Sequence, residues 1–178
     1  AQVWAWQRDG AGVTDYDCVR LQLDETGHVM SPIDGRSVVA PEKQAEWSLP
    51  VVSGIELKKL KSLAPGRPAG LPKLRAALGL IVEFRRSPLA GVLDLRVIDL
   101  SQPRILRVTT GDGGQVDLST GHLARQLNRW ARIRAHGQKF GLAIETVDLS
   151  VTNNVPVRWM LSPTVAGDIK SSKNLARK

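Results

Sequence analysis

The sequence predicts an α+β domain in which a largely antiparallel sheet is backed by two helices. Short runs of alternating apolar residues recur along the chain and end at turn residues, as expected of half-buried strands. Two longer segments carry apolar residues at helical spacing instead. The segments come in the order strands, helix, three strands, helix, two strands, which is typical of an antiparallel sheet covered by helices.

The N-terminal third of the chain predicts short strands joined by loops. Residues 1–6 alternate as a strand and are followed by a polar loop. Residues 19–23 and 28–30 form a hairpin around the turn Asp24-Glu25-Thr26-Gly27. Residues 31–47 then predict a loop that contains a short strand at Val38-Val39.

A short apolar strand and the first helix come next. Residues 49–54 read as a strand that ends in a bend at Gly54. The first helix follows the loop 65–72 and ends before Pro88, which cannot continue it. Gly79 costs about 1 kcal/mol there relative to alanine, so we expect it to mark close packing. The apolar stripe of this helix consists of Leu74, Ala77, Leu78, Ile81 and Phe84.

Three strands and a basic helix follow. The strands fall within residues 93–98, 105–110 and 115–118, and Gly111-Asp112-Gly113-Gly114 joins the last two as a hairpin turn. Ser119 or Thr120 suits the N-cap of the second helix, and Gly137 suits its C-cap. We expect the apolar stripe of this helix, Leu123, Leu127 and Trp130, to be buried against the sheet opposite a strongly basic face.

The last structured segment predicts a second hairpin. Two β-rich runs flank a polar break at Thr152-Asn153-Asn154, and the second run ends at Trp159. Because this strand lies near the end of the chain, we expect it at a sheet edge, where unpaired backbone groups form a template for a partner's strand. Residues 163–178 are rich in Ser, Lys and Asn without periodicity, and predict a disordered basic tail.

Composition narrows the class of protein. The chain has 178 residues, of which 42% are hydrophobic, and suits one globular domain or one domain plus a fragment of another. It contains no run of about 18 apolar residues, and its first residues do not resemble a signal peptide. Any signal or membrane anchor is expected outside this sequence.

The net charge of +8 favours an acidic partner, although solubility alone explains it equally well. Nucleic acid has weak support as that partner. The basic residues are dispersed, no aromatic ladder interleaves with them, and no helix-turn-helix or zinc-finger motif is present.

The sequence lacks the residue patterns of an enzyme or a metal site, so we expect neither catalysis nor a cofactor. A single cysteine, Cys18, excludes an internal disulfide and a cysteine-based zinc site. The three histidines lie far apart in sequence, and no phosphate-binding loop or nucleophile motif is present. We interpret Asp94, Asp99, Glu145 and Asp148 as solvated or strand-end carboxylates.

Four segments, taken in order, resemble the extracytoplasmic β domain of the bacterial cell division proteins FtsQ and DivIB. They are RLQLDETGHVM at residues 20–30, LPVVSG at 49–54, HLARQLNRWARI at 122–133 and VDLSVTNNVPVRW at 147–159. The resemblance covers the chain from about Arg20 to Trp159. It implies that residues 1–18 are the end of a POTRA domain with its linker, that 19–162 form the β domain, and that 163–178 are the tail.

The resemblance also implies a function and a site. Proteins of this type are scaffolds of the divisome, anchored in the inner membrane by one helix, that hold FtsB and FtsL at the septum without catalysis. In this family FtsB adds a strand to the edge formed by the last strand, and a basic position meets an acidic residue of the partner. Carried over by position, the partner-binding residues are Arg104, Val151, Thr152, Asn153, Asn154, Val155, Val157 and Trp159.

Two positions depart from the family pattern. Pro156 lies within the expected docking strand and lacks a backbone donor, which removes one bond to a partner if that donor would point outward. Val151 stands where an aromatic residue is common and offers less anchoring area. Two alternatives stay open, namely a POTRA-type envelope protein that handles polypeptides and a basic nucleic-acid-binding domain.

Overall fold

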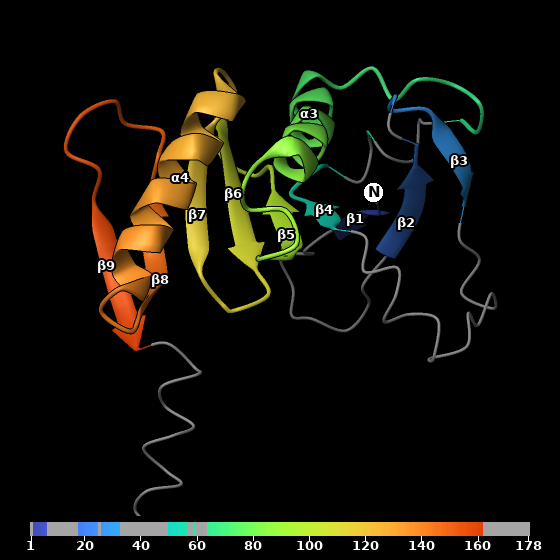
Figure 1. Cartoon of the computed structure of the whole chain (residues 1–178). Helices are drawn as coiled ribbons and strands as arrows, with labels where there is room; N and C mark the ends of the chain where they lie inside the picture. The colour runs from blue at the N-terminus through green and yellow to red at the C-terminus, as the bar shows by residue number, and fades with distance from the viewer. Residues whose placement is uncertain are drawn as a thin grey trace, which may run out of the picture.

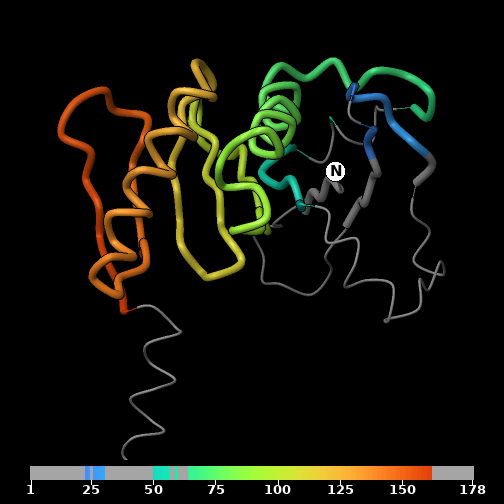
Figure 2. The backbone as a smooth tube through the Cα atoms, viewed as in Figure 1, coloured from blue at the N-terminus to red at the C-terminus, as the bar shows by residue number. Residues whose placement is uncertain are grey.

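In the residues that it describes, a computed structural model of the chain contains a nine-stranded sheet and two helices that lie on one of its faces (Figure 1). It describes residues 2–6, 18–24, 26–32, 50–56, 59 and 64–161, and Figure 2 traces their path. The predicted α+β class is therefore confirmed. The strands are β1 (Gln2–Trp6), β2 (Cys18–Leu23), β3 (Val29–Pro32), β4 (Val51–Ser53), β5 (Leu95–Asp99), β6 (Ile105–Thr110), β7 (Gln115–Ser119), β8 (Leu142–Asp148) and β9 (Val157–Leu161), and the helices are α3 (Pro72–Arg86) and α4 (Leu123–Gln138).

The sheet is largely antiparallel, as predicted, but it includes three parallel pairs. Its strand order is β3-β2-β1-β4-β5-β6-β7-β8-β9. The pairs β1–β4, β4–β5 and β7–β8 are parallel, and the other neighbours are antiparallel. The strand expected at residues 1–6 is β1, which lies between β2 and β4. The domain division at residue 18 stays a prediction.

Two consecutive units of the chain share one topology. Strand β4 leads through α3 to the parallel strand β5 and the antiparallel β6, and β7 leads through α4 to β8 and β9 in the same way. Strands β5 and β8 both end at an aspartate that is followed by Leu-Ser, at residues 99–101 and 148–150. In each case the aspartate accepts hydrogen bonds from the backbone and hydroxyl of the serine, and the leucine is buried. By this correspondence β9 is the equivalent of β6.

The core lies between the helix layer and the sheet. The buried face of α3 contains the predicted stripe except Ile81, which is half-buried, and it also contains Leu80, which was not predicted. Trp130 of α4 is 1% exposed, as predicted, and its ring centroid lies 6.1 Å from that of Phe84. These contacts fix both helices on the same face of the sheet (Figure 1). Neither helix of the described residues covers the opposite face, which we call the open face.

The ends of α4 differ from the prediction. The helix begins at Leu123 after His122, whose φ is 53°, rather than at a cap formed by Ser119 or Thr120. Ser119 is the last residue of β7, and the side chain of Gln126 accepts from its N–H at 2.9 Å. Gly137 lies inside the helix, which continues to Gln138.

The predicted first hairpin is present as β2 and β3. Its turn is organised by the Asp24 carboxylate, which accepts from the N–H groups of Thr26 at 2.9 Å and His28 at 2.8 Å. The hydroxyl of Thr26 also donates to it, at 2.8 Å, and this bond is the main cause that lowers the pKa of Asp24. The strand expected at residues 38–39 and the tail at 163–178 lie outside the described residues.

Candidate partner-binding edge

Strand β9 forms one end of the sheet. It pairs with β8 on one side, and within the described part of the chain no strand lies on its other side. The prediction that the last strand lies at an edge is confirmed for the described residues. The strand begins at Val157 and ends at Leu161, two residues beyond the predicted end at Trp159.

Alternate residues of β9 direct their backbone groups to the free edge. The N–H of Asp148 donates to the carbonyl of Pro156 at 3.2 Å, so the backbone groups of residue 156 face β8. Because the polar groups of successive strand residues point to opposite sides, Val157, Trp159 and Leu161 direct theirs outward. The missing donor of Pro156 thus weakens only the pairing with β8. The condition for losing a bond to a partner, an outward donor position at Pro156, is therefore not met.

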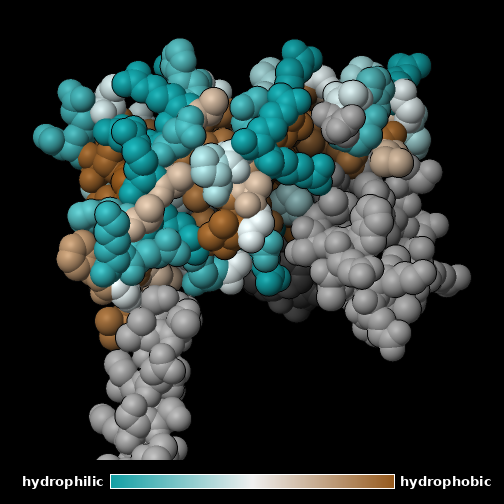
Figure 3. All heavy atoms as spheres, in the orientation of Figure 1, coloured by the Kyte–Doolittle hydropathy of each residue, from teal (hydrophilic) through white to brown (hydrophobic). Residues whose placement is uncertain are grey.

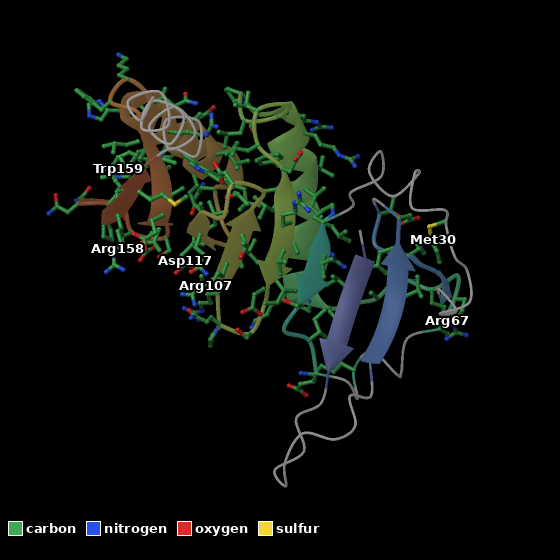
Figure 4. All side chains as sticks on the ribbon, turned by 90° about the horizontal axis from the view of Figure 1, so that it is seen from below. Met30, Arg67, Arg107, Asp117, Arg158 and Trp159 are labelled. Atoms are coloured by element: carbon green, nitrogen blue, oxygen red, sulfur yellow. The ribbon has the colours of Figure 1, made fainter. Side chains whose placement is uncertain are left out.

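Side chains of β9 divide between the two faces of the sheet. Val157 and Trp159 are half-buried and pack on the core side. The indole of Trp159 lies on Gly137 of α4, where an added Cβ would meet ring atoms Cη2 and Cε3 at 2.9 and 3.0 Å. The side chain of Arg158 is 72% exposed and points to the other side of β9, where its Nη1 lies 3.8 Å from Glu145 (Figure 4).

The connection between β8 and β9 is longer than the predicted tight turn. Eight residues, 149–156, separate the two strands. The guanidinium of Arg129 in α4 donates to the carbonyls of Val151 at 2.9 Å and Thr152 at 2.7 Å. Asn154 has a φ of 50°, a conformation that asparagine tolerates better than most residues. The four residues Val151, Thr152, Asn153 and Asn154 are exposed, and Val155 packs partly on the core.

Arg104 lies apart from the edge strand. It is an exposed residue with a φ of 61° in the turn before β6, and its carbonyl accepts from the N–H of Thr120 at 3.3 Å. The register places this turn at the same end of the sheet as residues 149–156. Three inter-strand spacings, roughly 14 Å, separate β6 from β9. The candidate residues therefore fall into an edge strand, an adjoining loop and one more distant arginine.

A row of charged residues crosses the open face of the sheet beside β9. Asp99, Arg107, Asp117 and Asp148 occupy paired positions on four neighbouring strands. Arg107 donates to both carboxylate oxygens of Asp117 at 2.8 Å, and this pairing raises the pKa of its guanidinium (Figure 4). The sequence did not indicate this row, because only the register of the strands brings these residues together.

The charged row borders a shallow groove of about 360 Å³ that reaches Pro156 and Arg158. Among the described residues no group of three or more His, Cys, Asp or Glu is arranged to hold a metal ion. No helix within the described ranges is long and apolar enough to cross a membrane.

The chain matches a known protein family. The family model for the C-terminal part of the cell division protein FtsQ/DivIB matches residues 16–150. Comparison with curated proteins finds no match. The matched range contains β2 to β8 and both helices, and it ends in the loop that precedes β9.

Proposed function

Because the chain belongs to the FtsQ/DivIB family of cell division proteins, we propose that it is a non-enzymatic divisome scaffold that binds FtsB/FtsL-like partners by strand addition to β9. Proteins of this family are membrane-anchored, have an extracytoplasmic domain and work in the division complex with other division proteins. The proposal places that recruitment at the septum. The family match favours it over a polypeptide-handling envelope protein or a nucleic-acid-binding domain.

The observation that carries the proposal is the free edge of β9. The outward N–H and C=O groups of Val157, Trp159 and Leu161 offer a partner the same hydrogen bonds that β7 makes with β6 in the equivalent unit. The edge is also held in place, because Trp159 packs on Gly137 and Val157 on the core. A rigid edge lowers the entropy cost of binding a strand.

In this proposal, loop residues 151–154 and Arg104 form additional contacts with the partner. The exposed residues 151–154 continue from the edge strand at its N-terminal end, where Arg129 holds the backbone. A partner that runs past this end of β9 would meet the loop first and then the end of the sheet that carries Arg104. A charge pair there would contribute more to specificity and association rate than to affinity.

The test is the affinity of an FtsB-like peptide for variants that remove one outward donor. Leu161→Pro deletes the outward N–H of a residue whose side chain is 63% exposed, and Leu161→Ala removes most of that side chain but keeps the N–H. We expect Leu161→Pro to bind at least tenfold more weakly than Leu161→Ala. Circular dichroism and thermal unfolding of both variants establish that they are folded. Equal affinities of the two variants and of a folded Val157→Pro variant would place the interface elsewhere.

A further inference from the structure

Charge is divided unequally between the layers of the molecule. Helices α3 and α4 carry eight lysine or arginine residues and one carboxylate, Glu83, which gives them a formal net charge of +7. Strands β5 to β9 carry three arginines and four carboxylates. Nearly all of the net charge of +8 therefore lies in the helix layer, which Figure 3 shows from outside with hydrophilic side chains over both helices.

Four of the basic side chains of the helix layer point away from the sheet. Arg75 and Arg86 of α3 and Arg125 and Arg132 of α4 are exposed, on the sides of the helices opposite their buried stripes. Of these four arginines, only Arg86 has a carboxylate of the described residues within 4 Å, namely Glu83 at 3.7 Å.

These arginines are not explained by the fold. Arg125, Arg129 and Arg132 follow one another at helical spacings of four and three residues, where like charges repel and destabilise the helix. Of the three, Arg129 bonds the loop carbonyls, whereas Arg125 and Arg132 form no ion pair with any residue that the structure describes. An anionic surface in contact with the layer would offset their repulsion. Guanidinium groups also match phosphate oxygens in geometry.

We propose that the outer surface of the helix layer, centred on Arg75, Arg86, Arg125 and Arg132, binds the surface of a membrane that contains anionic phospholipid. Four exposed arginines on two neighbouring helices of one layer suit a planar array of headgroups, and each adds to the attraction. The family is membrane-anchored, which keeps this domain near a bilayer. With the helix layer on the membrane, the edge of β9 and the open face of the sheet stay accessible, so lipid and a partner strand can bind together.

A nucleic acid would be the other polyanion to consider. A single-strand binder offers aromatic side chains on its basic surface for the bases to stack on. The aromatic residues Phe84 and Trp130 of these helices are instead buried beneath the layer, and the exposed Phe140 is a single ring beyond the end of α4 rather than a row of rings. An extracytoplasmic domain also meets lipid headgroups rather than nucleic acid. The observations therefore favour the membrane.

Binding to vesicles tests the proposal. In 0.05 M NaCl we expect the protein to co-sediment at least tenfold more strongly with vesicles of phosphatidylcholine and 30% phosphatidylglycerol than with phosphatidylcholine alone. Because salt screens exposed charges, 0.5 M NaCl should abolish this difference. No preference for the anionic vesicles would overturn the proposal.

Two double variants with the same net charge show whether vesicle binding depends on the helix-layer surface or on net charge alone. Arg125→Glu with Arg132→Glu reverses two exposed positions of α4, and Arg67→Glu with Arg96→Glu makes the same change at exposed positions outside both helices. We expect the first to lose at least tenfold in vesicle binding and the second to stay within threefold of the wild type. Equal losses would overturn the proposal, because net charge alone would then explain binding.

Two further measurements complete the test. If a 20-base-pair DNA duplex binds more tightly than the anionic vesicles at the same salt concentration and depends on Arg125 and Arg132, the surface is a nucleic-acid interface and the proposal fails. The α4 variant should bind the FtsB-like peptide as the wild type does. Its vesicle binding can therefore fail or succeed independently of strand addition to β9.

Discussion

Gly79 and Gly137 are both helical glycines, but a methyl group would meet different surroundings at the two positions. At Gly79 in α3 an added Cβ finds no atom within 4 Å. The prediction that Gly79 marks close packing was wrong, because a glycine in a helix does not by itself show that a neighbouring element covers that position. At Gly137 the indole of Trp159 occupies the space, and the sequence suggested a cap instead.

Because the surroundings differ, we expect substitution by alanine to have opposite effects on stability at the two glycines. We expect Gly79→Ala to stabilise the protein by about 0.5–1 kcal/mol, because alanine restricts the unfolded chain and favours the helix. Gly137→Ala should destabilise it, since the methyl group displaces Trp159, but should become stabilising in a Trp159→Ala background. Urea unfolding of the single and double variants measures both signs. If Gly137→Ala had the same effect in the two backgrounds, Trp159 would not pack on α4.

Among the substitutions considered, we expect truncation of Trp130 to cause the largest loss of stability. Its side chain is 1% exposed and contacts Phe84, so truncation leaves a cavity between α4 and the sheet. We expect Trp130→Ala to lower the free energy of unfolding by about 3–5 kcal/mol. Trp130→Phe, which keeps an aromatic ring, serves as the matched variant and should lose less. Near-native stability of the alanine variant would mean that this face of α4 is not the packed one.

The hydrogen bonds of Asp24 should make the stability of the protein depend on pH. Hydrogen bonds from Thr26 and His28 hold its pKa below the ordinary value of 3.8, so its contribution is present above that value and is lost as pH falls through the lower folded-state pKa. The stability difference between wild type and Asp24→Ala should therefore be larger at pH 5 than at pH 3. Urea unfolding at the two values measures it. A difference that grows on acidification would contradict the bonding seen in this turn.

At the scale of elements, the sequence predicted the type and order of the segments better than their pairing. Alternation and helical spacing are local signals, so the first hairpin, both helices and the strands from β5 to β9 could be predicted. The parallel pairs β4–β5 and β7–β8 depend on contacts across whole helices, which no local pattern encodes. The same holds for the row from Asp99 to Asp148, and for Trp159, whose packing on Gly137 joins residues 22 positions apart.

The side chain of Arg129 is expected to order the loop between β8 and β9. Arg129 bonds two successive carbonyls, at Val151 and Thr152, through a planar fork that lysine cannot reproduce. We expect Arg129→Lys and Arg129→Ala to accelerate amide hydrogen exchange in residues 150–155, with little change within β8. Equal protection in wild type and both variants would show that the loop is ordered by other contacts.

At the scale of the whole molecule, the division of charge predicts how salt acts on stability. In the described structure the ion pairs outside the Arg107–Asp117 pair are exposed or loosely spaced, and such pairs contribute little. Arginines three or four residues apart on α4 repel one another within the Debye length, which is about 10 Å at 0.1 M salt. Screening should therefore remove more repulsion than attraction. We expect the melting temperature to rise by about 2–4 °C between 0.02 and 0.3 M NaCl, equivalent to roughly 1 kcal/mol for a chain of this size.

The variant Arg125→Gln with Arg132→Gln locates the source of this salt effect. It removes two charges from the helix layer without adding any, and glutamine preserves helix propensity. Its melting temperature should exceed that of the wild type at low salt and rise less on addition of NaCl, as differential scanning calorimetry would measure. The matched variant Arg67→Gln with Arg96→Gln should keep the salt dependence of the wild type. If the melting temperature instead falls with salt in all three proteins, attraction between charges outweighs repulsion. The arginines of the helix layer would then cause no net repulsion that binding to an anionic membrane surface could offset.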